Sequence, residues 1–158
     1  MPTIHLTTFV AAPIDRVFDL HRSIFVHKQS MIQFNETVAS GITTGLLNAG
    51  EVVTWKSKHL YKTRFFKFKV LDMNYPTSFT EVQVKGDFKS LKHEHFFKPV
   101  RNGTLVIDLF HFDVKYGQAG LLFNKFYLTN YIRSVLEHRN KFIKDYAESK
   151  KWESLLNK

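Results

Sequence analysis

The chain has 158 residues and no cysteine, carries a net charge of +9 and is 44% hydrophobic. This length fits one domain with a sizeable core, and the composition excludes a disordered chain. The absence of cysteine excludes disulfides, thiol nucleophiles and zinc sites built on cysteine. No apolar run approaches the ~20 residues of a membrane span, and residues 1–10 lack the features of a signal peptide. We therefore expect a cytoplasmic protein.

In chain order, the first expected strand spans residues 3–10, which are rich in β-branched and aromatic side chains. Pro13 stands where helices often begin, and apolar spacing predicts two short helices over residues 14–21 and 23–30. Strand character returns at residues 33–40. The first forty residues thus combine two strands with two short helices.

Five further strands are expected as a meander at residues 51–59, 62–72, 78–84, 89–98 and 103–115. The breaks between them resemble hairpin turns, so the sheet should be antiparallel. The pattern then changes to a helix of about thirty residues that ends near Ser149, and its apolar stripe includes Leu121, Leu122, Leu128 and Ile132.

These elements predict an α+β architecture, in which a curved antiparallel sheet of about seven strands wraps around a long C-terminal helix. We expect one domain over residues 1–149 and a frayed tail over residues 150–158, unless Trp152 holds the tail in place.

Alternation along the strands assigns side chains to the two faces of the sheet. The lysines of the first hairpin must face solvent, so the aromatic residues between them face the long helix. The same rule turns several polar residues inward, where burial costs free energy unless they are paired or hydrated. The sequence therefore predicts a cavity lined by Trp55, His59, Phe66, Phe68, Glu81, Gln83, His93, His95, Asp108 and Phe112.

The turn at residues 101–103 brings His95 opposite Asp108, where the carboxylate would fix the ring's tautomer and raise its pKa. We interpret this pair as polar lining or structural pairing, with an acid–base pair as the alternative. The same alternation leaves Leu105, Ile107 and Leu109 facing outward. Either a β-bulge shifts the register and exposes Asp108, or this apolar strip contacts a second subunit.

One cluster of residues could hold a metal ion. Glu81, His93 and His95 resemble a two-histidine, one-carboxylate metal set, but the pattern is weak, and we predict no metal or other cofactor.

Two groups of basic residues have two interpretations each. Arg139 and Lys125 interrupt the apolar stripe of the long helix. Either their charged ends lie in water, or they provide a cation for a ligand carboxylate at the cavity mouth. The outward lysines are Lys56, Lys58, Lys67 and Lys69, with Lys62 at the turn, and they are either a solvated sheet surface or a weak contact for anionic membranes.

No nucleic-acid partner is predicted, because the basic residues are dispersed and form no zinc-finger or RNA-binding pattern. No phosphate-binding loop, dinucleotide fingerprint or nucleophile motif is present either. We therefore interpret the net positive charge as mainly a property of the solvated surface.

Four stretches resemble the helix-grip fold of the SRPBCC superfamily, which includes START, polyketide-cyclase and pollen-allergen relatives. They also resemble one bacterial branch, whose domain is sometimes fused to a cell-division-inhibitor-like epimerase. The stretches are Ala12-Pro13-Ile14-Asp15-Arg16-Val17-Phe18, Phe79 to Gly86, Lys92-His93-Glu94-His95-Phe96 and Gly103 to Asp108. The branch often has Trp at Leu91 and Tyr at Phe112, and the missing phenol removes one proton donor.

The resemblance covers residues 1–148 and implies a binding or carrier protein that holds a small, largely hydrophobic molecule between the sheet and the C-terminal helix. The alternative is an enzyme of the cyclase or dehydratase kind that uses the polar cavity residues as acids and bases. The fold does not decide between them. The expected partners are this ligand and, through the outward apolar strip, a second copy of the chain.

Overall fold

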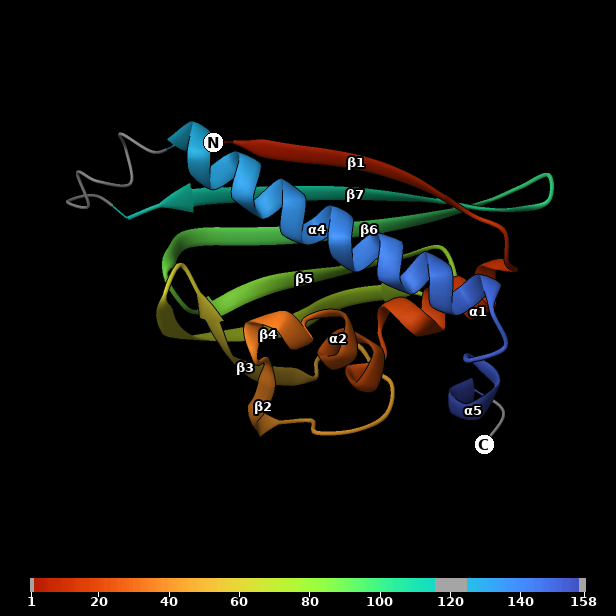
Figure 1. Cartoon of the computed structure of the whole chain (residues 1–158), viewed down its shortest axis with the longest axis horizontal. Helices are drawn as coiled ribbons and strands as arrows, with labels where there is room; N and C mark the ends of the chain where they lie inside the picture. Colours follow the sequence, from red (N-terminus) through yellow and green to blue (C-terminus); the bar gives the residue numbers. More distant parts are fainter. Residues whose placement is uncertain (1, 116–124, 157–158) are drawn as a thin grey trace.

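A seven-stranded antiparallel sheet and one long helix make up the two layers of the molecule (Figure 1). The computed structural model describes residues 2–115 and 125–156. The strand order is β1-β7-β6-β5-β4-β3-β2, so the first strand lies beside the last one. The strands are β1 (Thr3–Val10), β2 (Thr37–Gly41), β3 (Val52–His59), β4 (Lys62–Asn74), β5 (Ser78–Lys85), β6 (Phe88–Val100) and β7 (Gly103–Val114).

The helices all cover one face of the sheet (Figure 1). The two short ones, α1 (Ile14–His21) and α2 (Ile24–Ser30), follow β1, and Ser23 caps α2 because its hydroxyl accepts a hydrogen bond from the Val26 amide. The long helix α4 (Lys125–Glu148) crosses the sheet and contacts β1, α1 and α2. The expected start of this helix, with Leu121 and Leu122, lies outside the described residues.

One expectation about the elements is wrong. The segment predicted as a strand over residues 33–40 begins with a 3-10 turn, η1 (Ile32–Phe34), and the strand itself starts at Thr37. Asn35 ends the turn with a φ of 51°, a left-handed conformation that asparagine tolerates better than most residues. For the tail, the structure agrees with the alternative that Trp152 holds it in place: the Arg16 guanidinium lies 3.7 Å from the centre of the Trp152 ring, and a short helix α5 (Glu153–Leu156) follows.

Continuous pairing between β6 and β7 decides which way Asp108 points. The register runs without a shift from Ser90 to Val100, and His95 is the partner of Asp108 as the sequence predicts. Asp108 is only 1% exposed, so the bulge that would have turned it outward is absent. Leu105, Ile107 and Leu109 consequently alternate with buried residues and are half-buried on the outer face of the sheet.

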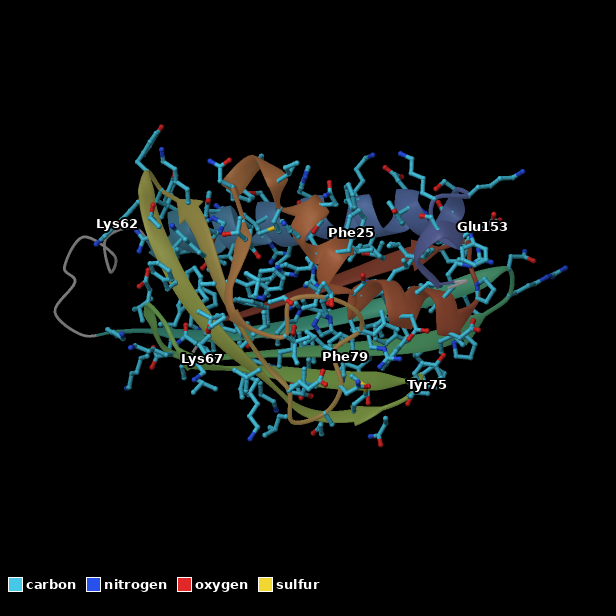
Figure 2. The ribbon with its side chains drawn as sticks, turned by 90° about the horizontal axis from the view of Figure 1, so that it is seen from below. Phe25, Lys62, Lys67, Tyr75, Phe79 and Glu153 are labelled. Atoms are coloured by element: carbon cyan, nitrogen blue, oxygen red, sulfur yellow. The ribbon has the colours of Figure 1, made fainter. Side chains whose placement is uncertain are left out.

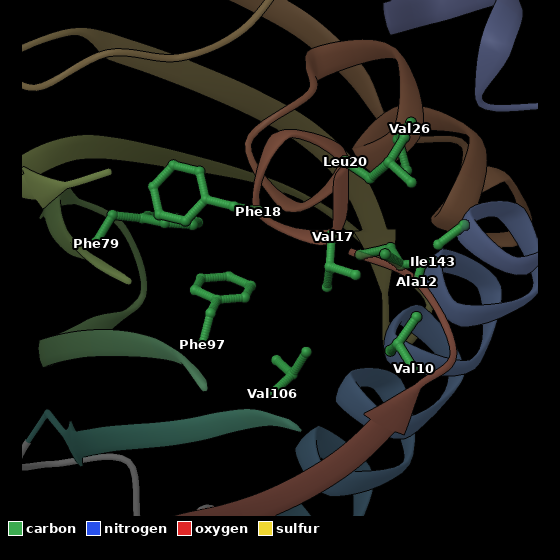
Figure 3. Close-up of a cluster of buried hydrophobic side chains, with 11 residues drawn as sticks. Val10, Ala12, Val17, Phe18, Leu20, Val26, Phe79, Phe97, Val106 and Ile143 are labelled. Carbon is green, nitrogen blue, oxygen red and sulfur yellow. The ribbon is translucent and has the colours of Figure 1, made fainter. Parts of the chain in front are cut away.

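The end of the molecule near α1 is solid. Phe18 packs with its ring centre 5.0 Å from that of Phe97 and 5.3 Å from that of Phe79, and all three rings are buried (Figure 3). Ile143 of α4 completes this cluster from the helix side. Each buried phenylalanine contributes roughly 1.5–3 kcal/mol, so this end anchors the helices on the sheet and leaves the other end free to be hollow.

Candidate ligand-binding cavity

A cavity of about 380 Å³ lies between α4 and the inner face of the sheet. This volume falls in the range that small-molecule sites occupy. Six of the ten residues that the sequence predicts as lining contribute to its wall. They are Trp55, His59, Phe66, Phe68, Glu81 and His93.

The other four predicted residues do not line the cavity. The Gln83 amide donates a 2.9 Å hydrogen bond to the Phe88 carbonyl and thereby ties β5 to β6. Phe112 is fully buried in the apolar cluster beneath the N-terminal half of α4. His95 and Asp108 are buried in contact with His93 but are not part of the wall. The assignment of faces by alternation is right for these residues, but a shared face does not fix the depth at which a side chain lies.

Sequence reasoning missed two parts of the wall. From α2 and the segment before β2 come His27, Met31 and Glu36, which have no periodicity that points to a cavity. From α4 comes Tyr131, whose spacing of three residues from Leu128 did place it near the apolar stripe. The remaining wall residues include Phe88, Leu91, Phe110, Leu128, Ile132, Val135 and Leu136.

A buried polar network forms the inner end of the cavity. His93 Nε2 donates to Asp108 Oδ1 at 3.0 Å, and Asn140 Nδ2 donates to Asp108 Oδ2 at 2.7 Å. His95 Nδ1 lies 2.8 Å from the same Oδ1, an ion-pair distance, although its N–H does not point along the line between the two atoms. His95 Nε2 donates to Glu81 Oε2 at 3.3 Å. Two carboxylates thus hold both rings.

Mutual interactions set the charges in this network. Burial would raise the pKa of Glu81, but the hydrogen bond and charge of His95 lower it to about 2. Burial would also raise the pKa of Asp108, yet the two histidines hold it well below its ordinary value. Burial would lower the pKa of His95, but the two carboxylates raise it. Burial and the neighbouring charge of His95 lower the pKa of His93 to about 4, so His93 is neutral at pH 7.

Arg139 brings a second positive charge to the inner end. It is 6% exposed and lines the cavity, so the interpretation that its charged end lies in water is wrong, and the side chain lies at the inner end rather than at the mouth. One guanidinium nitrogen donates to the carbonyl oxygen of His21 at 3.1 Å, while Nε has no partner among the described residues. The side chain of Lys125 lies outside the described part of the chain.

A second polar group lies near the end of β3. The Tyr131 hydroxyl and His59 Nδ1 are joined by a hydrogen bond of 2.8 Å, and burial lowers the pKa of His59. His27 pairs with Glu36 and stacks on Trp55 with ring centres 4.2 Å apart. Ser57, on the same strand face as His59, is buried, and its hydroxyl has no partner among the described residues.

The similarity of this chain to known proteins lies in its fold. No protein-family model matches the sequence, and no curated protein matches it significantly. Solved structures do match. TTHA0849 from Thermus thermophilus superposes with a TM-score of 0.70 at 16% identity, over 90% of this chain and 97% of that one. Major latex-like protein 151 from Panax ginseng has a TM-score of 0.66 at 15% identity, over 94% and 98%.

The di-domain ARO/CYC protein StfQ from the steffimycin biosynthetic pathway has a TM-score of 0.72 at 12% identity, over 92% of this chain and 50% of that one. The chain has the α+β helix-grip fold that these structures share. In the helix-grip fold the sheet curves around the C-terminal helix, and here the cavity lies between those two layers. Among the described residues of this helix-grip protein, no helix is long and apolar enough to cross a membrane.

The one cluster of the described residues that could hold a metal ion lies at the inner end of the cavity, with two of its three residues in the wall. Glu81, His93 and His95 each offer a ligand atom, and these atoms lie within 4.8 Å of one another. A divalent cation there would have to displace the proton shared by His95 and Glu81, beside the positive charge of Arg139, which acts on the pKa of Glu81 and His93. The negative charges of this network are already balanced by bound protons and by Arg139, so the absence of a bound metal stays our prediction.

Proposed function

We propose that this helix-grip protein is a binding or carrier protein for a small, largely apolar molecule that occupies the cavity between the sheet and α4. The observation that carries the proposal is a largely aromatic wall that also includes Ser57 and Arg139, whose buried Oγ and Nε atoms have no partner among the described residues. Leaving such an atom unpaired costs about 1–3 kcal/mol. A ligand with a suitably placed polar group would remove that cost.

Charge balance suggests the chemistry of this polar group. The charges of Glu81 and Asp108 are offset by Arg139 and by the protonated form of His95, which the raised pKa favours. A ligand with a formal negative charge would add an uncompensated buried charge, which is expensive. A neutral acceptor such as a ketone, ester or amide oxygen can instead accept from Arg139 Nε at no such cost.

The spacing of the polar groups on α4 indicates how long the ligand would be. Tyr131 and Arg139 are eight residues apart on α4, which corresponds to about 12 Å along the helix axis. A molecule that reaches both would carry one polar group at each end of an apolar or aromatic body. Trp55, Phe66 and Phe68 would contact the middle of such a ligand.

Uptake of a neutral fluorescent probe such as N-phenyl-1-naphthylamine tests the proposal. We expect stoichiometric binding to the wild-type protein and at least about tenfold weaker binding to Phe66→Arg, because a charge on the wall polarises the cavity. Phe65→Arg is the matched control, since Phe65 is the exposed neighbour on the other face of β4. Absence of uptake by the folded wild type would refute the carrier function, and native mass spectrometry would identify a co-purified ligand.

A cyclase- or dehydratase-like enzyme is the second candidate, favoured by the contact of Glu81 and His93 with the cavity. A general base works best with a pKa near the working pH, and the pKa of His93 is lowered to about 4. We therefore rank catalysis below binding. Chemical change of a bound aromatic ketone, stopped by His93→Asn without loss of affinity, would reverse this order.

We also propose that two copies pair through the outer apolar strip, which consists of Phe96, Leu105, Ile107 and Leu109. Phe96 is 37% exposed and is the register partner of Ile107. The strip lies on two paired strands and away from the cavity, and this position supports its role as an interface.

A further inference from the structure

The cavity reaches the surface at one end of the molecule. Its wall includes the exposed residues Lys62 and Asp87, together with Leu60, Val114 and Leu128. These residues belong to the β3–β4 turn, the start of β6, the end of β7 and the first turns of α4, which lie together at the same end in Figure 1. We call this region the open end, in contrast to the solid end near α1.

Three aromatic side chains are exposed at the open end. Tyr61 at the tip of the β3–β4 hairpin is 99% exposed, and Phe126 and Tyr127 in the first turn of α4 are 87% and 59% exposed. Tyr127 stacks on Tyr131 with ring centres 6.5 Å apart, and Tyr131 bonds to His59, next to the hairpin tip. Tyr127 is therefore connected through Tyr131 to His59 at the base of the hairpin tip.

The hairpin tip holds its aromatic residue outward at a conformational cost. Leu60 and Tyr61 have φ values of 53° and 63°. Two such residues in succession form the kind of turn that usually contains Asn-Gly, and bulky residues in this region are strained. A sequence selected for stability alone would not place Leu-Tyr there, which points to a function for the exposed ring.

The charge around the opening is positive. Lys58 and Lys62 flank the tip, and Lys56 and Lys67 follow on the outer face of the same hairpin, where Figure 2 shows Lys62 at the tip and Lys67 further along β4. Within the described part of this end, Asp87 pairs with Arg64 and Asp113 with Lys89, so both carboxylates are already compensated.

We propose that the open end docks on the surface of an anionic lipid bilayer through Lys58, Tyr61, Lys62, Phe126 and Tyr127. Aromatic rings sit favourably at the level of the headgroups, and lysines are attracted to anionic lipids. The proposal rests on the proposed carrier function in one respect: a docked open end lets an apolar ligand pass between bilayer and cavity without crossing water. A convex hairpin tip with strained, exposed rings fits a bilayer better than a nucleic acid, whose binding sites are charged grooves.

Co-sedimentation of the full chain with vesicles tests the docking. We expect binding to phosphatidylcholine vesicles that contain about 30% phosphatidylglycerol, little binding to pure phosphatidylcholine, and release in about 0.5 M salt. The double variants Tyr61→Ser/Phe126→Ser and Lys58→Glu/Lys62→Glu should each bind at least about tenfold more weakly. Matched controls away from the open end are Phe25→Ser and Lys150→Glu, which change exposed residues and should bind as the wild type does.

The outcomes separate docking from ligand binding, because probe uptake in solution is measured on the same samples. Loss of vesicle binding with intact uptake in Tyr61→Ser/Phe126→Ser, whose two positions are not part of the cavity wall, supports the docking surface. Equal vesicle binding by open-end variants and controls overturns it. It is also overturned if single-stranded DNA binds more tightly than vesicles, with no effect of Tyr61→Ser/Phe126→Ser. Vesicle binding without any probe uptake would refute the carrier function and leave the docking surface standing.

Discussion

At the scale of single residues, the histidines behind the cavity wall couple the stability of the protein to pH. Burial lowers the pKa of His21 to about 3, although the charge of Asp108 opposes this shift. In an unfolded chain the same ring titrates near pH 6.5. Between these values the unfolded state binds more protons, so the free energy of unfolding falls as the pH drops from about 6.5 towards 3. His93 acts in the same direction, whereas His95, with a raised pKa, contributes stability that is lost as the pH rises through that pKa.

We predict that His21→Leu flattens this acid dependence. Leucine has a similar volume and binds no proton, so between pH 6 and 4 the slope should decrease by about 1.4 kcal/mol per pH unit. The substitution removes the 2.8 Å hydrogen bond from His21 Nδ1 to the Val17 carbonyl, whereas Nε2 has no partner among the described residues. Urea unfolding at several pH values measures the slope. His138→Leu, at an exposed position of α4, is the control, and equal slopes for wild type and His21→Leu would contradict the prediction.

The sequence predicted which residues face inward but not how they pair. Alternation placed His93, His95 and Asp108 on one face, and the strand register makes His95 the partner of Asp108. The carboxylate nevertheless accepts a hydrogen bond from His93, two residues away along the strand. Side-chain rotamers and the amide of Asn140, which comes from α4, decide this geometry. A periodic pattern contains no information about either.

At the scale of elements, the short C-terminal helix stabilises the solid end. Leu155 and Leu156 pack against the buried cluster that contains Val17 and Phe18, and Trp152 is covered by Arg16. We predict that Trp152→Ala lowers the free energy of unfolding by about 2 kcal/mol, from lost apolar burial and the lost cation–π contact. Thermal and urea unfolding measure the change.

Lys151→Ala is the control for this helix, because Lys151 is exposed next to Trp152. It should change the free energy of unfolding by less than about 0.5 kcal/mol. If Trp152→Ala also had so small an effect, the tail would be frayed in solution, as the sequence alone suggests. Probe uptake should remain in both variants, since residues 151–156 are not part of the cavity wall.

Strands with strict alternation were predicted to within a few residues, as for β1 and β3, because one buried face fixes their pattern. The start of β2 was not predicted correctly, since the residues of β2 are largely exposed and show no alternation of buried and exposed side chains. The wall formed by His27 and Glu36 was missed for a related reason. Their pairing joins α2 to the segment before β2, and only the tertiary fold brings these two together.

At the scale of the whole molecule, the packing is divided between a solid and a hollow end. Rings at the solid end fill the space between helices and sheet, while at the open end Trp55, Phe66 and Phe68 face a cavity. A hollow core buries less apolar area against protein, so the solid end must carry more of the stability. Substitutions in the cavity wall are therefore expected to affect binding more than folding.

The outer face of β6 and β7 gives the last prediction, which concerns assembly. Phe96, Leu105, Ile107 and Leu109 bury several hundred Å² if two copies pair, worth a few kcal/mol at ~25 cal/mol per Å² before association costs. A two-fold dimer is the simplest arrangement, because each copy presents the same strip. We predict that the wild type sediments as a dimer at tens of micromolar and that Ile107→Lys is a folded monomer. Phe25→Lys, at an exposed apolar position on α2, should remain dimeric. A monomeric wild type at that concentration would refute the interface, as would an Ile107→Lys variant that is folded and still dimeric.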